Sequence, residues 1–518
     1  MRRVRFGVIA MKPSMKPSPS RVPTRLAAAP PPQGPSLLAC FLAIVADWEP
    51  VFPQSRTYLR AVRQALGTLI CLGRHTLTRI IWANGGEQQN WRPEYFLFSR
   101  SQWNPAQLFT PLIQRALGWC RGRYIGVAID DTRLHKTGPR IQQAFLQRDP
   151  LSPKFYVNLM FGLRFLQASL LVPLFRQAKV GTRALPIAFE EVSVIKRPRR
   201  KLPKRKACKG KARPGKPTAK RTKPLSELEQ EWKQYRAAQR LHNLSTRFVD
   251  LMHRLRATFD ACGAAKKTLL LAVDGSFCNR TVFAAVVKGV ELIARARKDL
   301  KLCFRADDGS RRIYGVEKFT PEQVKLDDSR PWKTTKVFYG GKRRKVEYKE
   351  VSGVLWQGGA RQRLLRLLVI RPTRYRKQKG GRWYYRQPAY LLTTVVRGTV
   401  PQLLQIYFDR WQIEVNHREE KDTLGVGQAQ LRHIISVPKQ PAFAVACYSA
   451  LLLASLQAFG AERGKAYAAL PKWRRRAARP SALDLIALLR KEMTENPEMV
   501  AHLGLNPTNR RLTEAAAA

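Results

Sequence analysis

The chain has 518 residues, of which 95 are Lys or Arg and 36 are Asp or Glu, so its formal net charge is +59. Hydrophobic residues make up 44% of the sequence, which excludes a mostly disordered protein. A charge of this size argues against an enzyme of small molecules and predicts a polyanionic partner, either a phosphate polymer or, as the rival, a membrane surface.

Eight cysteines are spread along the chain without a CxxC pair, and no histidine cluster occurs at zinc-binding spacing. In a chain of this length the pattern predicts reduced thiols of a cytoplasmic protein rather than a disulfide framework. The first residues contain only a short apolar stretch before Lys12 and Pro13, so no signal peptide is expected.

The N-terminal part of the chain divides into a tail and a helical region. Residues 1–35 are rich in Pro, Ser, Ala and basic residues, which predicts a disordered tail. Residues 36–122 show several short helical patterns with Arg between them. Two interpretations are open for 36–122: a DNA-binding region, or a plain helical cap on the next domain.

The pattern changes to strands at residues 124–132, a short β-branched run that ends in Asp130 and Asp131. This run predicts a buried strand that delivers carboxylates at its C-terminal edge. The apolar stretches 155–165 and 168–175 predict the strands that follow.

A basic arm follows at residues 196–223, where about half of the residues are Lys or Arg. Such a run predicts a solvated, mobile segment, either a non-specific DNA contact or a bare linker. Ser226 and Glu229 have the spacing of a capping box and predict the start of a long amphipathic helix that continues through Arg256.

A second buried strand is predicted at residues 268–273, and it also ends in an acid, Asp274. Residues 304–388 are basic and rich in Gly and aromatic residues, which predicts an inserted β-rich subdomain. The later window 441–461 approaches membrane-spanning length, but it contains Ser and Gln and precedes a basic segment, so a buried helix is expected.

The stretch 407–421 lacks Gly and Pro and predicts a helix. At roughly 100° per residue, four of its side chains fall within about 60° of one another, whereas Glu419 and Glu420 point away. These four are Tyr407, Arg410, Glu414 and Lys421. One carboxylate beside two cations and a phenol suits metal and phosphate binding, although a solvated face with an i,i+4 ion pair is the alternative.

Three acids come from separate elements: Asp131 and Asp274 at strand ends and Glu414 on the helix. Strand ends of one sheet can converge on a point, and a helix across that end can add the third carboxylate. Three hard oxygen donors suit two Mg²⁺ or Mn²⁺ ions that activate a water or 3′-hydroxyl and stabilise the leaving oxygen of a phosphoryl transfer.

The spacing Y-x(2)-R-x(3)-E-x(6)-K of these four helix residues resembles the signature of one large group of bacterial insertion-sequence DDE transposases. The pair Asp131-Thr132 and the segment Asp274-Gly-Ser-Phe277 resemble that group's first and second acidic motifs. The β-rich insertion before the Glu also matches its layout, and the resemblance covers residues 120–435.

The resemblance implies an RNase H-like core, here residues 123–435, that cuts DNA at terminal inverted repeats and joins the 3′-hydroxyl to a target. It implies that Asp131, Asp274 and Glu414 hold the metals and that the signature cations contact phosphates.

Under this resemblance, two Mg²⁺ or Mn²⁺ ions lie between the three acids, and Tyr407, Arg410 and Lys421 contact phosphates near the transposon end. Lys136 and His135, which closely follow the first acid, could also reach phosphate. An alternating strand points only one of Asp130 and Asp131 inward, and Asp131 is chosen because the Asp-Thr pair resembles the family motif.

In relatives, a Trp of the β-rich insertion can stack on a flipped base, for which Trp332, Trp356 and Trp383 are candidates, with core packing as the alternative for each. The partners implied are the terminal inverted repeats and a target DNA, bound by a homodimer in the cytoplasm at the nucleoid, with no membrane.

The sequence thus predicts an α/β protein with an RNase H-like mixed-sheet core, an inserted β-rich subdomain, and helical regions at 36–122 and 436–518. The predicted function is metal-dependent DNA cleavage and strand transfer. Two alternatives remain: an RNase H-like nuclease without strand transfer, and a non-catalytic DNA-binding descendant.

Overall fold

The computed structural model describes residues 35–505 apart from 139, 150–151, 154, 175–180, 196, 199–225, 308, 379 and 461–478. The predicted tail 1–35 and basic arm 196–223 therefore lie almost wholly outside the described residues. The seven cysteines within the described residues are free thiols, and Cys208 lies outside these residues.

A ten-stranded mixed sheet runs through the described part of the chain, in the order β2-β3-β1-β5-β6-β12-β9-β8-β7, with β4 paired to β3. β1 is parallel to β5, and β5 is parallel to β6, whereas the other neighbours are antiparallel. The predicted mixed α/β class is confirmed. The strands are β1 (Tyr124–His135), β2 (Phe145–Arg148), β3 (Leu159–Pro173), β4 (Thr182–Glu191), β5 (Thr268–Val273), β6 (Val290–Arg295), β7 (Lys333–Tyr339), β8 (Lys342–Val354), β9 (Leu365–Ile370) and β12 (Ala389–Thr393).

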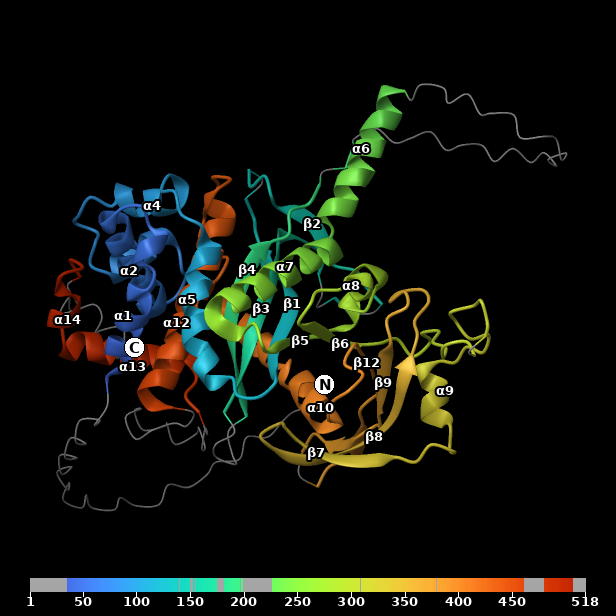
Figure 1. Cartoon of the computed structure of the whole chain (residues 1–518). Helices are drawn as coiled ribbons and strands as arrows, with labels where there is room; N and C mark the ends of the chain where they lie inside the picture. Colours follow the sequence, from blue (N-terminus) through green and yellow to red (C-terminus); the bar gives the residue numbers. More distant parts are fainter. Residues whose placement is uncertain are drawn as a thin grey trace, which may run out of the picture. The chain divides into compact units, whose positions relative to one another are not determined.

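Helices surround this sheet, and a separate two-stranded sheet is formed by β10 (Arg374–Arg376) and β11 (Trp383–Tyr385) (Figure 1). The α-helices are α1 (Leu37–Ala46), α2 (Ser55–Ile70), α3 (Leu77–Ala83), α4 (Arg92–Ser99), α5 (Phe109–Ala116), α6 (Glu227–His242), α7 (Leu244–Phe259), α8 (Arg280–Ala284), α9 (Pro321–Leu326), α10 (Val400–Asp409), α11 (Gln412–Arg418), α12 (Ser436–Phe459), α13 (Ala482–Glu495) and α14 (Glu498–Ala501). A π-helical turn, η6 (Glu419–Thr423), follows α11.

The central strand β1 is longer than predicted, because its two neighbours end at different points. Its parallel partner β5 ends at Val273, opposite Ile129. Its antiparallel partner β3 continues to pair with it as far as His135. The two acids of β1 were predicted at the end of the strand, but the strand continues past them. They lie at the level where the parallel neighbour β5 has ended and the antiparallel neighbour β3 has not.

The two faces of β1 pack against different elements. Val127 and Ile129 belong to the large core that also contains residues of α1, α5, α7 and α12. On the opposite face, Ala128 packs against Ile413 of α11. A Cβ atom added at Gly126 would lie 3.1 Å from the Ile406 side chain of α10. Small residues on this face therefore let α10 and α11 lie close to the strand.

The predicted β-rich insertion at 304–388 is rich in strands, but it is not a separate sheet. β7, β8 and β9 extend the same sheet, because β12 pairs with β9 on one side and with β6 on the other. All six residues of β9 are buried, as expected for an interior strand. The prediction of an inserted subdomain is corrected in this respect.

Helix α12 is the apolar helix predicted near the C-terminus, and it lies in the core. It packs against α1, α2, α5, α13 and β4, so N- and C-terminal helices lie side by side (Figure 1). It is long and apolar enough to cross a membrane, but it is buried from Ser436 to Leu456 except at Pro438. The prediction of a buried helix is confirmed, and the helices of 36–116 form a cap over it.

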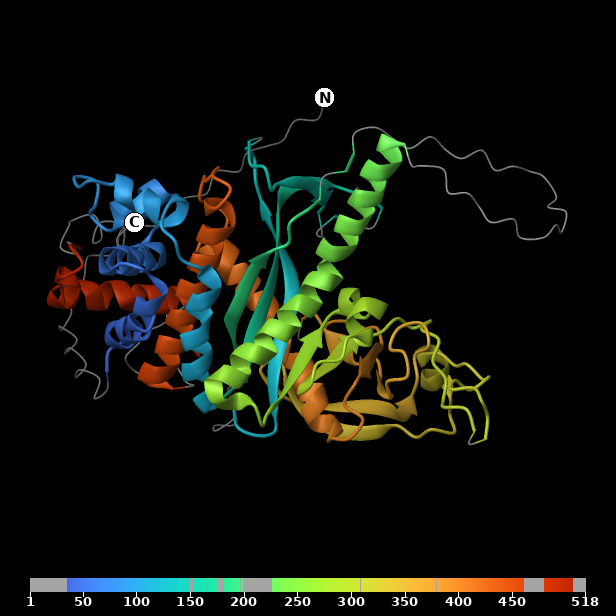
Figure 2. The same ribbon diagram turned by 45° about the horizontal axis from the view of Figure 1, so that its top comes forward.

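The predicted long helix 226–256 is two helices, α6 and α7, of which α7 runs across the sheet (Figure 2). The predicted capping box at Ser226 and Glu229 is present. The break falls at Asn243, whose extended backbone ends α6 and whose side chain accepts a hydrogen bond from the amide of Thr246 to begin α7.

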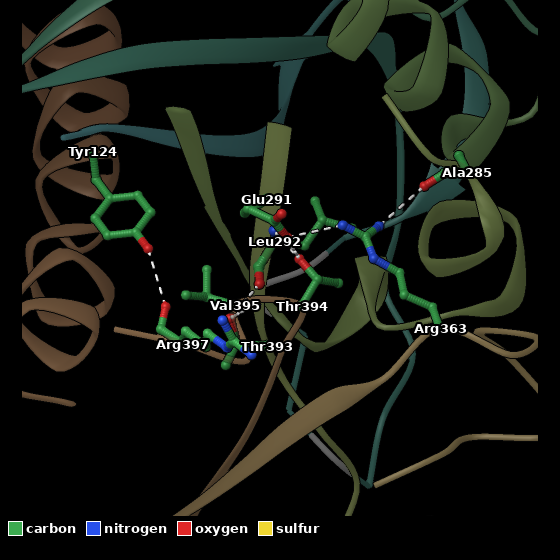
Figure 3. Close-up of polar contacts among 9 residues, drawn as sticks. All are labelled: Tyr124, Ala285, Glu291, Leu292, Arg363, Thr393, Thr394, Val395 and Arg397. Carbon is green, nitrogen blue, oxygen red and sulfur yellow. Dashed lines mark hydrogen bonds and ion pairs between the residues drawn. The ribbon is translucent and has the colours of Figure 1, made fainter. Parts of the chain in front are cut away.

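A polar cluster fixes the place where β12 ends and the chain turns toward α10 (Figure 3). The carboxylate of Glu291 on β6 binds Arg363 at 2.8 Å and accepts a hydrogen bond from the hydroxyl of Thr394. The backbone amide of Leu292 donates to that hydroxyl at 2.8 Å. The segment that leads into α10 is therefore anchored to the central strands by buried hydrogen bonds.

Candidate active site

Two acids from different strands lie side by side on the face covered by α10 and α11. Ile129 of β1 is in register with Val273 of β5, so the next residues, Asp130 and Asp274, are neighbours and point to the same face. The pKa of the Asp130 carboxyl is raised to about 6, chiefly because burial disfavours its charged form. His417 opposes this rise, and the negative charge of Asp274 adds to it.

Asp131 points to the opposite face of β1. Its carboxylate forms an ion pair with Arg164 of β3 at 2.8 Å, and its side chain is 14% exposed. The alternation of the strand thus points one acid toward α10 and α11, as expected, but that acid is Asp130. The choice of Asp131 is corrected, because Asp131 is the one whose charge is already paired.

The predicted single helix 407–421 is interrupted. α10 ends at Asp409 and α11 begins at Gln412, and the junction is held by tight i→i+3 hydrogen bonds such as Glu414 amide to Trp411 carbonyl at 3.1 Å. A uniform 100° per residue therefore does not apply across this stretch. The expectation of one straight helix is wrong, and a π-helical turn at η6 adds a second departure.

The signature side chains nevertheless gather beside the two acids. Arg410 donates a hydrogen bond to the carboxylate of Glu414 at 3.2 Å. The phenol of Tyr407 has a raised pKa, chiefly because it is buried, and it feels the charges of Arg410, Arg295 and Asp274 in turn. Tyr407, Arg410, Glu414 and Asp274 therefore share one electrostatic environment.

Lys421 reaches the same region from the π-helical turn. Burial lowers the pKa of its ammonium group, and the charges of Glu420, Asp422 and Asp130 counteract the decrease. The structure thus places Lys421 within electrostatic reach of Asp130.

A buried polar network beneath the site was not predicted. Gln167 of β3 donates a hydrogen bond to the carboxylate of Glu420 at 2.8 Å, and the other oxygen of Glu420 lies 3.5 Å from a ring nitrogen of His417. Glu420 is only 2% exposed, so its carboxylate lies inside the protein within this network. The signal in the sequence is a Gln within the otherwise apolar run of β3.

Arg295 is a second residue that sequence reasoning missed. Val273 of β5 is in register with Ala294 of β6, so Arg295 lies next to Asp274. Its charge acts on the phenol of Tyr407. Asp130, Asp274 and Arg295 therefore form a row across three neighbouring parallel strands.

Lys136 does not offer its charge to solvent. Its ammonium group donates hydrogen bonds to the backbone carbonyls of Gly427 at 2.5 Å and Ala429 at 3.2 Å. Burial lowers the pKa of this group to about 8. The prediction that Lys136 contacts DNA is corrected, because its hydrogen bonds hold the 425–432 loop instead.

The three candidate tryptophans differ in their surroundings. Trp356 is 9% exposed and packs edge-on against Phe283, so it is a core residue. The Trp332 ring contacts Lys349 and Arg371. The Trp383 ring is 43% exposed and contacts Arg374 and Arg376, at 4.9 and 4.0 Å to the ring centre.

The donors suit a divalent cation only in part. Within the described residues, no three Asp, Glu, His or Cys side chains form a group that could hold an ion by themselves. Asp130 and Asp274 are adjacent, and two carboxylates supplemented by waters and substrate phosphates are a common way to bind Mg²⁺. Glu414, the third predicted donor, is paired with Arg410.

Comparison with known proteins adds no relative: no family model matches the chain, and no curated protein matches it significantly.

Proposed function

We propose that this protein is a DDE-type DNA transposase with an RNase H-like core. In support, an antiparallel unit of β1, β3 and β4 is extended by the parallel strands β5 and β6. Such a mixed sheet is compatible with that core. The net charge of +59 suits a DNA substrate.

The observation that carries the proposal is the meeting of distant sequence motifs at one place. Asp130 and Asp274 come from two parallel strands, and Tyr407, Arg410 and Glu414 come from the helices that cover them. A purely structural role would favour paired charges, as at Asp131. Two adjacent acids with a raised pKa at Asp130 instead suit a cation and a phosphate substrate.

Asp130 and Asp274 would hold the divalent ions, with Glu414 as the third candidate ligand. When bound, these ions supply the activation of a water or 3′-hydroxyl and the neutralisation of the leaving oxygen. This assignment rests on the chemistry of two adjacent carboxylates, which repel one another until a cation lies between them.

Arg410 would bind a phosphate oxygen of the DNA. Its Nε–H is buried and has no hydrogen-bond partner, which is costly unless a ligand accepts from it. The Nη2 atom of the same guanidinium group donates to Glu414, so Arg410 would hold a phosphate through Nε while it keeps the Glu414 carboxylate in place.

Tyr407 and Lys421 would position the DNA backbone beside the acids. The phenol O–H of Tyr407 would donate a hydrogen bond to a phosphate oxygen. Lys421 would supply a positive charge on the Asp130 side. The protein would work in the cytoplasm on nucleoid DNA, as a dimer that pairs two DNA ends.

The proposal is tested with DNA that carries the inverted repeats flanking the gene. Purified protein should cleave this DNA at the repeat ends when Mg²⁺ or Mn²⁺ is added, and should join the 3′-hydroxyl ends to a second DNA. Glu414→Gln should lose cleavage and retain binding. Metal-dependent cleavage that is unchanged in Glu414→Gln would contradict the role of Glu414.

The strand-transfer step separates the proposal from its nearest alternative. An RNase H-like nuclease would cut the same DNA through the same acids but would leave the 3′-hydroxyl ends unjoined. A DNA-binding descendant would bind the repeats and show no metal-dependent cleavage at all.

A further inference from the structure

A cationic pocket lies beyond the acid site, at the end of β1. Its volume is about 990 Å³, and it lies between the β1 end, the turn after α2 and the loop that follows η6. The basic side chains that line it are Arg74, Arg133, Lys136, Arg140, Lys421 and Arg432. None of the described residues that line this cationic pocket is Asp or Glu. So many basic side chains around one pocket without a carboxylate in its lining call for an anionic ligand.

The loop that forms one wall of the cationic pocket is held firmly. The amide of His75 donates a hydrogen bond to the Gln428 side chain at 2.9 Å, and Lys136 binds the carbonyls of Gly427 and Ala429. Gly427 has φ +94°, and a Cβ atom there would lie 3.1 Å from Leu134. The wall is therefore preorganised by contacts with both β1 and the α2–α3 turn.

Arg133 gives an independent sign that a ligand belongs in the cationic pocket. Its Nε–H is buried and has no hydrogen-bond partner. A buried donor without a partner costs stability unless something accepts from it. An oxygen of a phosphate group would meet that requirement.

Lys421 links the cationic pocket to the acid site. It lines the pocket, and its ammonium group feels the charges of both Asp130 and Arg133. A strand whose reacting phosphate lies beside Asp130 could therefore place its next phosphates in the pocket.

We propose that the cationic pocket binds consecutive phosphates of the DNA strand that leads away from the reacting bond. This inference rests on the proposed function and adds a binding site to it, partly built by the Arg74 turn of the N-terminal helical region. No Phe, Tyr or Trp is among the described residues that line the pocket. The described lining therefore offers no aromatic ring on which a base could stack, and its basic side chains suit phosphate oxygens.

The test replaces two exposed pocket residues, in Arg140→Gln/Arg432→Gln. The matched control is Arg311→Gln/Arg312→Gln, which removes the same charge from exposed positions outside the pocket. Affinity for a random-sequence DNA duplex is measured by fluorescence anisotropy over a range of salt concentrations. Each lost phosphate contact should lower the slope of log K against log salt by about 0.9, so the pocket variant should lose about 2.

The pocket variant should also bind DNA at least about tenfold more weakly than the control at 0.1 M salt. An affinity and slope equal to those of the control would overturn the inference. That result would leave the proposed function intact if the wild type still cleaves and joins repeat DNA. The predicted loss of slope in the pocket variant, together with a wild type that never cleaves repeat DNA, would instead contradict the proposed function alone.

Discussion

Asp130 and Asp131 are adjacent in β1, yet the two faces of the strand give them opposite surroundings. Asp131 faces Arg164 and forms an ion pair with it at 2.8 Å. The carboxylate of Asp130 accepts a hydrogen bond from the amide of Asp131 and lies next to a second acid, Asp274. Paired charge stabilises a fold, whereas adjacent acids cost stability and are retained where a ligand compensates for them.

The largest expected effect is on catalysis by Asp130→Asn. Because this change removes a carboxylate that faces Asp274, metal-dependent DNA cleavage should fall by about 1,000-fold or more. Asp131→Asn is the matched control, and its cleavage rate should stay within about fivefold of the wild type when both are folded. Rates are measured on repeat DNA, with circular dichroism to check the fold.

A loss of cleavage in Asp131→Asn that equals the loss in Asp130→Asn would remove the distinction between the two faces. A loss of cleavage in Asp131→Asn alone would show that Asp131, the acid that the sequence motif favours, has the catalytic role.

The next largest effect concerns Glu191, at the end of β4, whose buried position alone raises its pKa to about 7. Below its unfolded-state pKa of about 4.5 such a carboxyl is protonated in both states and costs the folded protein no stability. The cost grows as the pH rises, because ionisation is then favoured in the unfolded state, and it is complete above pH 7. Glu191→Gln should therefore stabilise the protein by up to about 3 kcal/mol at pH 8 relative to its effect at pH 4. Urea denaturation at both pH values measures this difference.

Glu191 differs from Asp130 in that burial by itself raises its pKa, with no contribution from the charge of another acid. An effect of Glu191→Gln that is the same at pH 4 and pH 8 would show that burial in this sheet does not perturb carboxyl groups as inferred.

A smaller effect is expected from the buried network of Glu420, Gln167 and His417, of which His417 acts electrostatically on the Asp130 carboxyl. Glu420→Leu removes the acceptor for Gln167 and the neighbour of His417, so cleavage should fall by about tenfold while DNA affinity stays unchanged. Glu420→Gln keeps an oxygen acceptor and should restore most of the activity. A Glu420→Gln variant as impaired as Glu420→Leu would contradict a positioning role through this hydrogen bond.

The smallest effect is the coupling between Asp131 and Arg164. Both side chains are partly exposed, at 14% and 25%, so solvent screens the ion pair. A double-mutant cycle with Asp131→Ala and Arg164→Ala should give a coupling of about 1 kcal/mol in the free energy of unfolding. Zero coupling would mean that the pair does not account for the position of Asp131.

Much of the central sheet could be predicted from the sequence, because buried strands appear as apolar runs that end in acids. The runs before Asp130 and Asp274 are strands β1 and β5, as expected. The length of β1 could not be predicted, since it depends on how far β3 continues beside it. The single sheet formed with β7, β8 and β9 likewise depends on pairing between distant segments.

The candidate site was predicted in its residue types but not in its geometry. Strand alternation requires that one of Asp130 and Asp131 face α11, but only the packing of Gly126 and Ala128 shows which. Helical angles separated Glu420 from the signature residues because they assume an uninterrupted helix. The junction after Asp409 and the π-helical turn at η6 change those angles.

The central claim is that Asp130 and Asp274, rather than Asp131, hold a divalent cation. Titration of Mn²⁺ into the metal-free protein, with the free ion followed by electron paramagnetic resonance, tests this claim without DNA or turnover. The wild type and Asp131→Asn should bind Mn²⁺ equally, and Asp130→Asn and Asp274→Asn should each bind at least tenfold more weakly. Equal Mn²⁺ binding by the wild type and Asp130→Asn, or a loss confined to Asp131→Asn, would contradict the claim.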